Sequence, residues 1–259
     1  MAFQTVVQIS DTHLMQSPHA QFVGMNPEDT FLGLMQHIQA THSPIDCLVH
    51  TGDLAQEAHP HTYTRYLEYM ASLKIPFYQT PGNHDDLNCF PLQNYERVSV
   101  IDLKPWSIIL INSAVKGRTD GCIAETDLQM LIYFLEQHQD RHIIVACHHH
   151  PIEMQSHWID QHKLKNTPDF ANVLKQYPNI KAVIHGHVHQ EAHQKLGHID
   201  IFSVPSTCVQ FKPKSYNFAL DAMAPGYRIL KLYDNGEFFT QVYRVPALIP
   251  NTDPSLSGY

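Results

Sequence analysis

Short apolar runs alternate with amphipathic stretches along most of this chain. The runs are bounded by polar or turn-forming residues, which is typical of buried strands; they occupy residues 3–9, 46–50, 76–79, 106–111, 142–147, 181–184 and 199–204. Between them, apolar side chains recur at the spacing of a helix face in residues 31–38, 63–70, 128–135 and 170–174. Alternating strands and helices predict an α/β layered fold.

Two local signals sharpen this prediction. Asn26, followed by Pro27 and two acidic residues, has the composition of a helix start, with a capping side chain, a proline in the first turn and favourable charges. Asn235-Gly236 separates two β-type runs, which predicts a tight hairpin near the C-terminus. The last residues, 246–259, contain three prolines and two serines and are expected to form a tail.

Polar side chains follow five of the predicted strands. In layered α/β folds the functional residues gather just beyond the carboxyl ends of the strands. The five groups are Asp11-Thr12-His13, Gly52-Asp53, Gly82-Asn83-His84-Asp85, His148-His149-His150-Pro151 and His185-Gly186-His187-Val188-His189.

The chemistry of these groups indicates a metal centre. Carboxylates, an amide oxygen and imidazoles suit borderline divalent metals such as Mn, Fe, Co, Ni or Zn. Asp11 and His13 lie two residues apart, so they face the same side of an extended segment, and a carboxylate such as Asp53 can bridge two cations. Each group alone is weak, but five in this order are not expected by chance.

The composition shows a surplus of histidines, and only their positions in the sequence indicate which of them could bind metal. The chain of 259 residues has 20 histidines, more than its 17 lysines and arginines together, and a formal net charge of −8. With no basic stripe to follow a phosphate backbone, a stable nucleic-acid partner is not expected. The surplus histidines are either a compositional habit or metal ligands, and twelve of them lie outside the strand-end groups.

The cysteines and the apolar runs indicate the cellular compartment of the protein. Five widely spaced cysteines, with no C-x-x-C pair, favour a reducing cytoplasm. The first residues resemble a strand rather than a signal peptide, and no apolar run is long enough to cross a bilayer. We therefore expect a cytoplasmic protein without a membrane partner.

The order D-x-H, G-D, G-N-H-D, H-x-x-P, G-H-x-H resembles the calcineurin-like metallophosphoesterase superfamily over residues 9–189. This resemblance implies a four-layered αββα sandwich of two mixed β-sheets, with residues 1–245 as a single metallophosphoesterase domain. The stretches 156–164 (SHWIDQHKL), 185–191 (HGHVHQE) and 205–213 (PSTCVQFKP) extend it, being similar to the bacterial class III 3′,5′-cyclic-AMP phosphodiesterases. That family also implies a homodimer.

Carried over residue by residue, the resemblance implies two metal ions per chain, Fe and Mn first, with Zn, Co or Ni as other options. Asp11, His13 and His189 would hold one ion. Asn83, His148 and His187 would hold the other, with Asp53 bridging both. Paired cations activate a shared water for in-line displacement at phosphorus.

The implied reaction is hydrolysis of 3′,5′-cyclic AMP to 5′-AMP by a metal-bridging hydroxide. His84 would protonate the leaving oxygen as general acid, and Asp85 would orient His84. His149 is either a hydrogen-bonding neighbour of the ligands or a phosphate contact. Thr207, Gln210 and Asn217 either contact the nucleotide or have core and loop roles. His157 and His162 lie in a loop that would border the cleft.

Two other functions remain open. One is a broader phosphodiesterase of the same superfamily, acting on 2′,3′-cyclic nucleotides or similar esters; the segment 205–226 favours the narrower activity. A non-catalytic metal-binding scaffold is the second. It is disfavoured because every ligand that the superfamily pattern requires is present.

Overall fold

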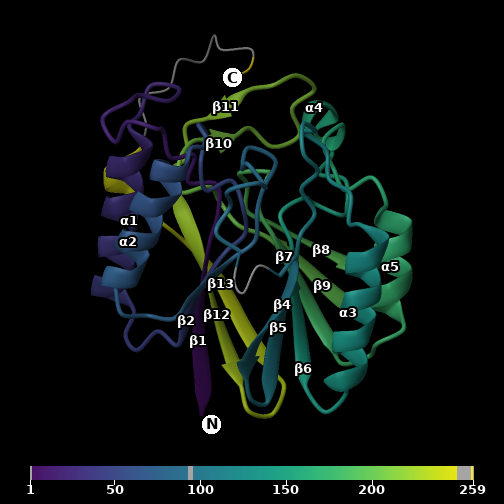
Figure 1. The fold of residues 1–259 in the computed structure, drawn as a ribbon. Coiled ribbons are helices and arrows are strands. Elements are labelled where there is room, and N and C mark those ends of the chain that lie inside the picture. The colour runs from purple at the N-terminus through teal and green to yellow at the C-terminus, as the bar shows by residue number, and fades with distance from the viewer. Residues whose placement is uncertain (1, 93–95, 250–257, 259) are drawn as a thin grey trace.

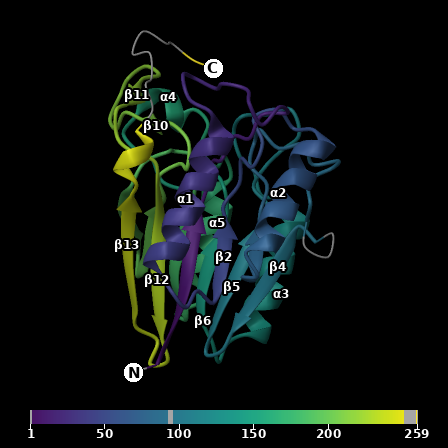
Figure 2. The ribbon, with the colours of Figure 1, turned by 90° about the vertical axis from the view of Figure 1, so that its left-hand side faces the viewer.

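Two mixed β-sheets lie face to face between two layers of helices (Figure 1). The computed structural model describes residues 2–92, 96–249 and 258. This is the expected four-layered αββα sandwich. The helical layers are α1 and α2 on one side and α3 and α5 on the other, as the views in Figures 1 and 2 agree.

The first sheet has five strands in the order β13-β12-β1-β2-β3. Its strands are β1 (Phe3–Ile9), β2 (Cys47–His50), β3 (Phe77–Gln79), β12 (Gly226–Tyr233) and β13 (Phe238–Arg244). β1 pairs in parallel with β2 and antiparallel with β12, so the first strand of the chain lies beside one of the last. The β12–β13 hairpin turns at Asn235-Gly236, as predicted, with Gly236 at a positive φ of 84°.

The second sheet has six strands in the order β4-β5-β6-β7-β9-β8. They are β4 (Val98–Leu103), β5 (Trp106–Ile111), β6 (His142–Ala146), β7 (Ile180–His185), β8 (Ala192–Leu196) and β9 (Ile199–Ser203). β4 and β8 were not predicted. β8 is an edge strand whose residues alternate between half-buried and exposed, so it has no apolar run to mark it.

The helices bury one face each. They are α1 (Pro27–Thr41), α2 (Pro60–Ser72), α3 (Glu125–Gln137), α4 (His157–Asp160) and α5 (Thr167–Lys175). The Asn26 side chain accepts hydrogen bonds from the amides of Glu28 at 2.9 Å and Asp29 at 3.2 Å, which confirms the predicted start of α1. No helix in the described ranges is both long and apolar enough to span a membrane.

Side-chain alternation along the strands separates the core into three layers. In β1, Val6 faces the second sheet, whereas Val7 and Ile9 face α1 and α2. Both faces of the central strands are therefore buried, which is why these segments read as continuous apolar runs.

Short elements cover the end of the sandwich at which β1 finishes. α4 lies there with β10 (Gln210–Phe211) and β11 (Leu220–Asp221), at the top of Figure 1. The expected tail begins with a 3₁₀ turn, Pro246–Leu248, whose Leu248 packs against Gly33 of α1. Residues 250–257 and 259 of that tail lie outside the described residues.

Candidate metal centre

The structure brings all seven predicted ligands together at one end of the sandwich. The first sheet supplies Asp11 and His13 after β1, Asp53 after β2 and Asn83 after β3. The second supplies His148 after β6, and His187 and His189 after β7. Because the two sheets face each other, these side chains meet across the gap between them.

The backbone is strained at five of these positions. The φ angle lies between 48° and 69° at Asp11, His13, Asp53, His187 and His189. Residues other than glycine rarely adopt this left-handed backbone conformation. Among the described residues only four other non-glycine residues do so. Strain of this kind persists where the surrounding structure over-determines it and clusters at functional sites.

Two glycines allow the loops to approach closely. A Cβ atom at Gly52 would collide with the ring of His148, and one at Gly186 would collide with Ser10 and Asp11. A glycine at each position is therefore a packing requirement of the site itself.

One group of ligand atoms surrounds His189. Its Nε2 lies 3.1 Å from His13 Nε2 and 3.5 Å from Asp11 Oδ1. Asp11 also accepts hydrogen bonds from the backbone amide of His187 at 3.1 and 3.2 Å. Two imidazole nitrogens and a carboxylate oxygen thus converge on one point.

A second group surrounds His148. Its Nε2 lies 3.3 Å from Asp53 Oδ2 and 3.2 Å from Asn83 Oδ1. The same Asp53 oxygen lies 3.9 Å from His13 Nε2, in the first group. Asp53 is therefore the carboxylate between the two groups, where a bridging ligand is expected.

Carbonyl and amide oxygens orient three of the imidazoles through Nδ1. His148 donates to Thr51 O at 2.7 Å, His189 to Val209 O at 2.8 Å and His13 to Gln56 Oε1 at 2.8 Å. Such partners fix the tautomer and direct Nε2 into the site, as around metal-binding histidines generally. Sequence reasoning did not identify these three partners.

Burial and neighbouring charges shift the pKa values of several site residues toward the protonation states that bind cations. Burial lowers the pKa of His13 to about 3 and that of His187 well below its usual value, so both are neutral imidazoles at pH 7. Burial opposes charge on Asp53 too, but His148 and His84 hold the pKa of this carboxyl well below its usual range. Neutral imidazoles and ionised carboxylates are the forms that bind metal.

The residues present fit a pair of metal ions. Four sets of three ligand atoms lie close enough to share an ion: Asp11, His13 and His189; Asp11, Asp53 and His148; His13, Asp53 and His84; His148, His149 and His187. The buried Nε2 atom of His187 has no hydrogen-bond partner, a cost that a bound cation removes. Nitrogen and oxygen donors without thiolate suit borderline divalent metals.

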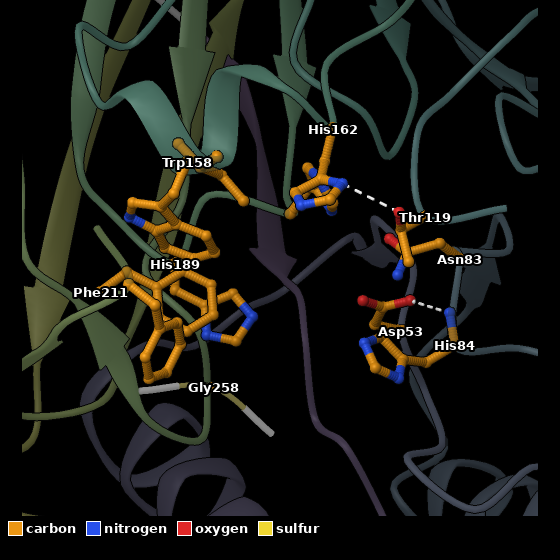
Figure 3. Close-up of a pocket in the computed structure, with 12 residues that line it drawn as sticks. Asp53, Asn83, His84, Thr119, Trp158, His162, His189, Phe211 and Gly258 are labelled. Atoms are coloured by element: carbon orange, nitrogen blue, oxygen red, sulfur yellow. Dashed lines mark hydrogen bonds between the residues drawn. The ribbon is translucent and has the colours of Figure 1, made fainter. Parts of the chain in front are cut away.

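His84 and Asp85 have separate roles. The half-buried His84 lies at the edge of the centre, and its backbone amide donates to Asp53 Oδ1 at 2.9 Å (Figure 3). The Asp85 carboxylate instead accepts hydrogen bonds from the amides of Gly82, Leu54 and Ala55 and from the hydroxyl of Tyr63. The expectation that Asp85 orients the His84 ring therefore needs correction: Asp85 holds the loop that carries Asn83 and His84.

A cavity of about 290 Å³ opens beside the centre. Figure 3 shows two unlike walls: Asp53, Asn83 and His84 form a polar wall on one side, and Trp158 and Phe211 an aromatic wall on the other. Phe218 also lines the cavity and contacts both aromatic rings. The remaining lining residues are Thr119, Ile159, His162, His187, His189 and Gly258.

Three of the expected substrate contacts, Thr207, Gln210 and Asn217, are not in this lining. Thr207 and Gln210 are buried, and the Gln210 amide donates to the carbonyls of Ser206 and Cys208. Asn217 is exposed. Their positions fit the alternative of core and loop roles.

His149 is also absent from the cavity lining. It is buried, and its Nδ1 lies 2.8 Å from Ser113 Oγ. This contact favours the alternative in which His149 is a hydrogen-bonding neighbour of the ligands.

The aromatic wall was missed by sequence reasoning. Its Trp158 and Phe211 lie within the stretches 156–164 and 205–213, where only polar side chains were expected to contact a nucleotide. Of the two histidines expected to border the cleft, His162 lines the cavity, and its Nδ1 lies 2.8 Å from Thr119 Oγ1. His157 is not in the lining, and its ring stacks on Tyr216 with centroids 4.6 Å apart.

Comparison with known proteins places this architecture in a family. The calcineurin-like phosphoesterase profile matches residues 4–191, and the chain belongs to that family. It is 34% identical to the 3′,5′-cyclic adenosine monophosphate phosphodiesterase CpdA of Vibrio vulnificus and to that of Escherichia coli K12; each comparison covers 98% of this chain and 94% of the relative. Among solved structures, a dimetal phosphatase from Danio rerio superposes with a TM-score of 0.64 at 15% identity, covering 92% of this chain and 98% of that one.

Proposed function

We propose that this chain is a metal-dependent phosphodiesterase that hydrolyses 3′,5′-cyclic AMP to 5′-AMP. Residues 1–245 act as one metallophosphoesterase domain in this proposal. It is supported by the ligand geometry, by the family and by relatives named as cyclic-AMP phosphodiesterases that match over nearly the full chain.

Two metal ions, Fe or Mn before Zn, Co or Ni, occupy the proposed centre. Asp11, His13 and His189 hold one and Asn83, His148 and His187 the other, with Asp53 shared. When bound, such a pair polarises the phosphoryl group and makes water a stronger nucleophile.

The chain's own residues position the ester and supply a proton. The polar wall receives the cyclic phosphate, since Asn83 and His84 border both the cavity and the ligand groups. Water attacks phosphorus, the bond from phosphorus to O3′ breaks, and the His84 ring gives its proton to O3′ as general acid. The proton that the water loses restores the protonated His84 ring. Asp85 supports this step through the loop beneath His84.

The observation that carries the proposal is the place of Asp53 between two ligand groups, with one oxygen 3.3 Å from His148 and 3.9 Å from His13. The test is cyclic-AMP turnover and metal content, measured on the same sample. Asp53→Asn should lower both, whereas Asp102→Asn, which alters a carboxylate 56% exposed on β4, should change neither. Absence of turnover at every metal loading would refute the proposal.

A panel of esters separates this activity from a broader one. Comparable turnover of 2′,3′-cyclic AMP and simple aryl diesters would favour a general metallophosphoesterase.

The proposal also includes a cytoplasmic location and a homodimer. Sedimentation of the purified protein would test the homodimer.

A further inference from the structure

A pair of polar side chains lines the cavity outside the metal centre. Thr119 comes from the loop after β5 and His162 from the turn after α4, and His162 Nδ1 lies 2.8 Å from Thr119 Oγ1 (Figure 3). Apart from the indole of Trp158, whose nitrogen is buried, these are the polar side chains that the described lining has outside the centre. The reaction proposed above uses neither of them.

Backbone hydrogen bonds hold the two segments together. The Gly121 amide donates to Lys163 O at 3.3 Å, and the Lys165 amide donates to Gly121 O at 2.8 Å. Gly121 also lies directly against the centre, because a Cβ atom there would collide with the ring of His149. That ring meets the ring of His148 edge to face, with centroids 4.9 Å apart. The pair is therefore positioned relative to the ligand groups before a substrate binds, which reduces the ordering cost of binding.

The pair is neutral and can both donate and accept hydrogen bonds. Burial and the nearby charge of Lys165 lower the pKa of His162, so its imidazole is uncharged at pH 7. Within the described ranges Thr119 is the one hydrogen-bond partner of this ring, through Nδ1, which leaves Nε2 for a ligand. Nε2 donates if the Thr119 hydroxyl donates to Nδ1, and it accepts if Nδ1 carries the proton. A hydroxyl group satisfies either arrangement, whereas a phosphate oxygen, which only accepts, satisfies one.

We infer that Thr119 and His162 form a subsite for the 2′-hydroxyl of a 3′,5′-cyclic ribonucleotide. The 3′ and 5′ oxygens of such a substrate are esterified, so the 2′-hydroxyl is the one free hydroxyl of its sugar, and it lies on the carbon next to the one that carries O3′. A nucleotide whose phosphate lies at the polar wall brings this hydroxyl into the same cavity of about 290 Å³. The inference rests on the proposed function and adds what distinguishes ribose from deoxyribose.

The test compares cyclic AMP with 2′-deoxy cyclic AMP, which lacks only this hydroxyl. The unaltered enzyme should prefer cyclic AMP by about 3- to 10-fold in kcat/KM, the discrimination that one neutral hydrogen bond gives. His162→Phe keeps an aromatic ring without polar atoms. It should therefore lower kcat/KM for cyclic AMP to the value for the deoxy ester and leave the deoxy ester unchanged. His162→Gln, whose amide can take the place of Nε2, should keep most of the preference.

Two further variants complete the comparison. Thr119→Val removes the partner of Nδ1 and should reduce the preference. His61→Phe, on the exposed first turn of α2, is the matched control and should leave the preference unchanged. Metal content and melting temperature, measured on every variant, show whether the centre and the fold are retained.

Equal preference of the unaltered enzyme for the two esters, or a preference for cyclic AMP that survives in His162→Phe, would overturn the subsite. Equal losses on both esters in His162→Phe would also overturn it, because this residue would then only support the shape of the cavity. Each of these results leaves the proposed function standing. Inactivity of the unaltered enzyme toward both esters refutes the proposed function instead.

Calorimetry gives a second readout that does not depend on turnover. Titration of the metal-loaded protein with 5′-AMP should give a Kd about 3- to 10-fold lower than titration with 2′-deoxy-5′-AMP. His162→Phe should make the two values equal, and unequal values in that variant contradict the subsite.

Discussion

At the scale of single residues, the centre depends on imidazoles that are each oriented by one hydrogen-bond partner. His148, His189 and His13 all use Nδ1 for that partner. His84 differs because it is half-buried and lines the cavity beside the centre.

His84 is therefore the residue whose replacement should separate chemistry from metal binding. His84→Gln removes the proposed proton donor and should lower kcat by about 10²- to 10⁴-fold. Steady-state kinetics together with elemental analysis check this, with His61→Gln on the exposed surface as control. Full activity in His84→Gln would contradict the assignment of the general acid.

His50 should make the fold sensitive to acid. It is buried in β2 beside Tyr66, and burial lowers its pKa to about 3 from a value near 6.5 in the unfolded chain. Between these values the unfolded chain binds the extra proton, so the contribution of His50 to stability is complete above pH 6.5 and is lost as the pH falls toward 3.

His50→Gln should accordingly flatten the decline of stability below pH 6.5, by up to about 1.4 kcal/mol per pH unit. Urea unfolding between pH 4.5 and 7.5 measures this slope. His61→Gln, on the surface, should leave it as it is; an unchanged slope in His50→Gln would mean that other buried histidines carry the effect.

At the scale of elements, the loops after the strands are built to carry ligands. Asp85 ties the loop after β3 to the loop after β2 through three backbone amides. One carboxylate thus sets the distance between Asn83 and Asp53.

Asp85→Ala should loosen both loops. Three buried amides lose their acceptor, so we expect a loss of at least ~2 kcal/mol in the free energy of unfolding, together with weaker metal binding. Urea unfolding in chelator isolates the first effect, and metal titration measures the second. Asp86→Ala removes the hydrogen bonds of an adjacent carboxylate to Asn88 and Cys89 and serves as the control. Equal stability of the two variants would refute the bracing role of Asp85.

The sequence was most informative where a local rule applied. Apolar runs located β1, β2, β5, β6 and β7, and the strand-end rule then located the ligands, because the carboxyl ends of parallel strands share one edge. The sequence was least informative where tertiary packing, rather than a local pattern, determines the position of a residue. β8 is a polar edge strand, and Trp158 and Phe218 meet only through tertiary structure, so neither shows a periodic signal. The partner of Asp85 was misjudged for the same reason, since Leu54 and Ala55 lie 31 and 30 residues away.

At the scale of the whole molecule, the centre joins two sheets. Asp11, Asp53 and Asn83 come from one sheet, His148 and His187 from the other, and the apolar core between the sheets lies behind them. Ions bound at this seam stabilise only the folded state.

Removal of metal should therefore lower the melting temperature. With metal at roughly 100 times its Kd, the linkage is worth about 2.7 kcal/mol, or about 5–10 °C for a chain of this size. Calorimetry with and without chelator measures the shift, which should shrink in Asp53→Asn and persist in Asp102→Asn. A melting temperature that does not change with chelator would argue against metal ions bound between the two sheets.

The pairing of β1 with β12 has a consequence for how the protein is made. β1 leaves the ribosome before Gly226–Tyr233, the strand with which it pairs, and Asp11 leaves before His187, whose amide it binds. A nascent chain therefore displays the early carboxylates without the late imidazoles. The centre can therefore assemble only after His187 and His189 have left the ribosome, and the first sheet is complete only after β12 has followed them.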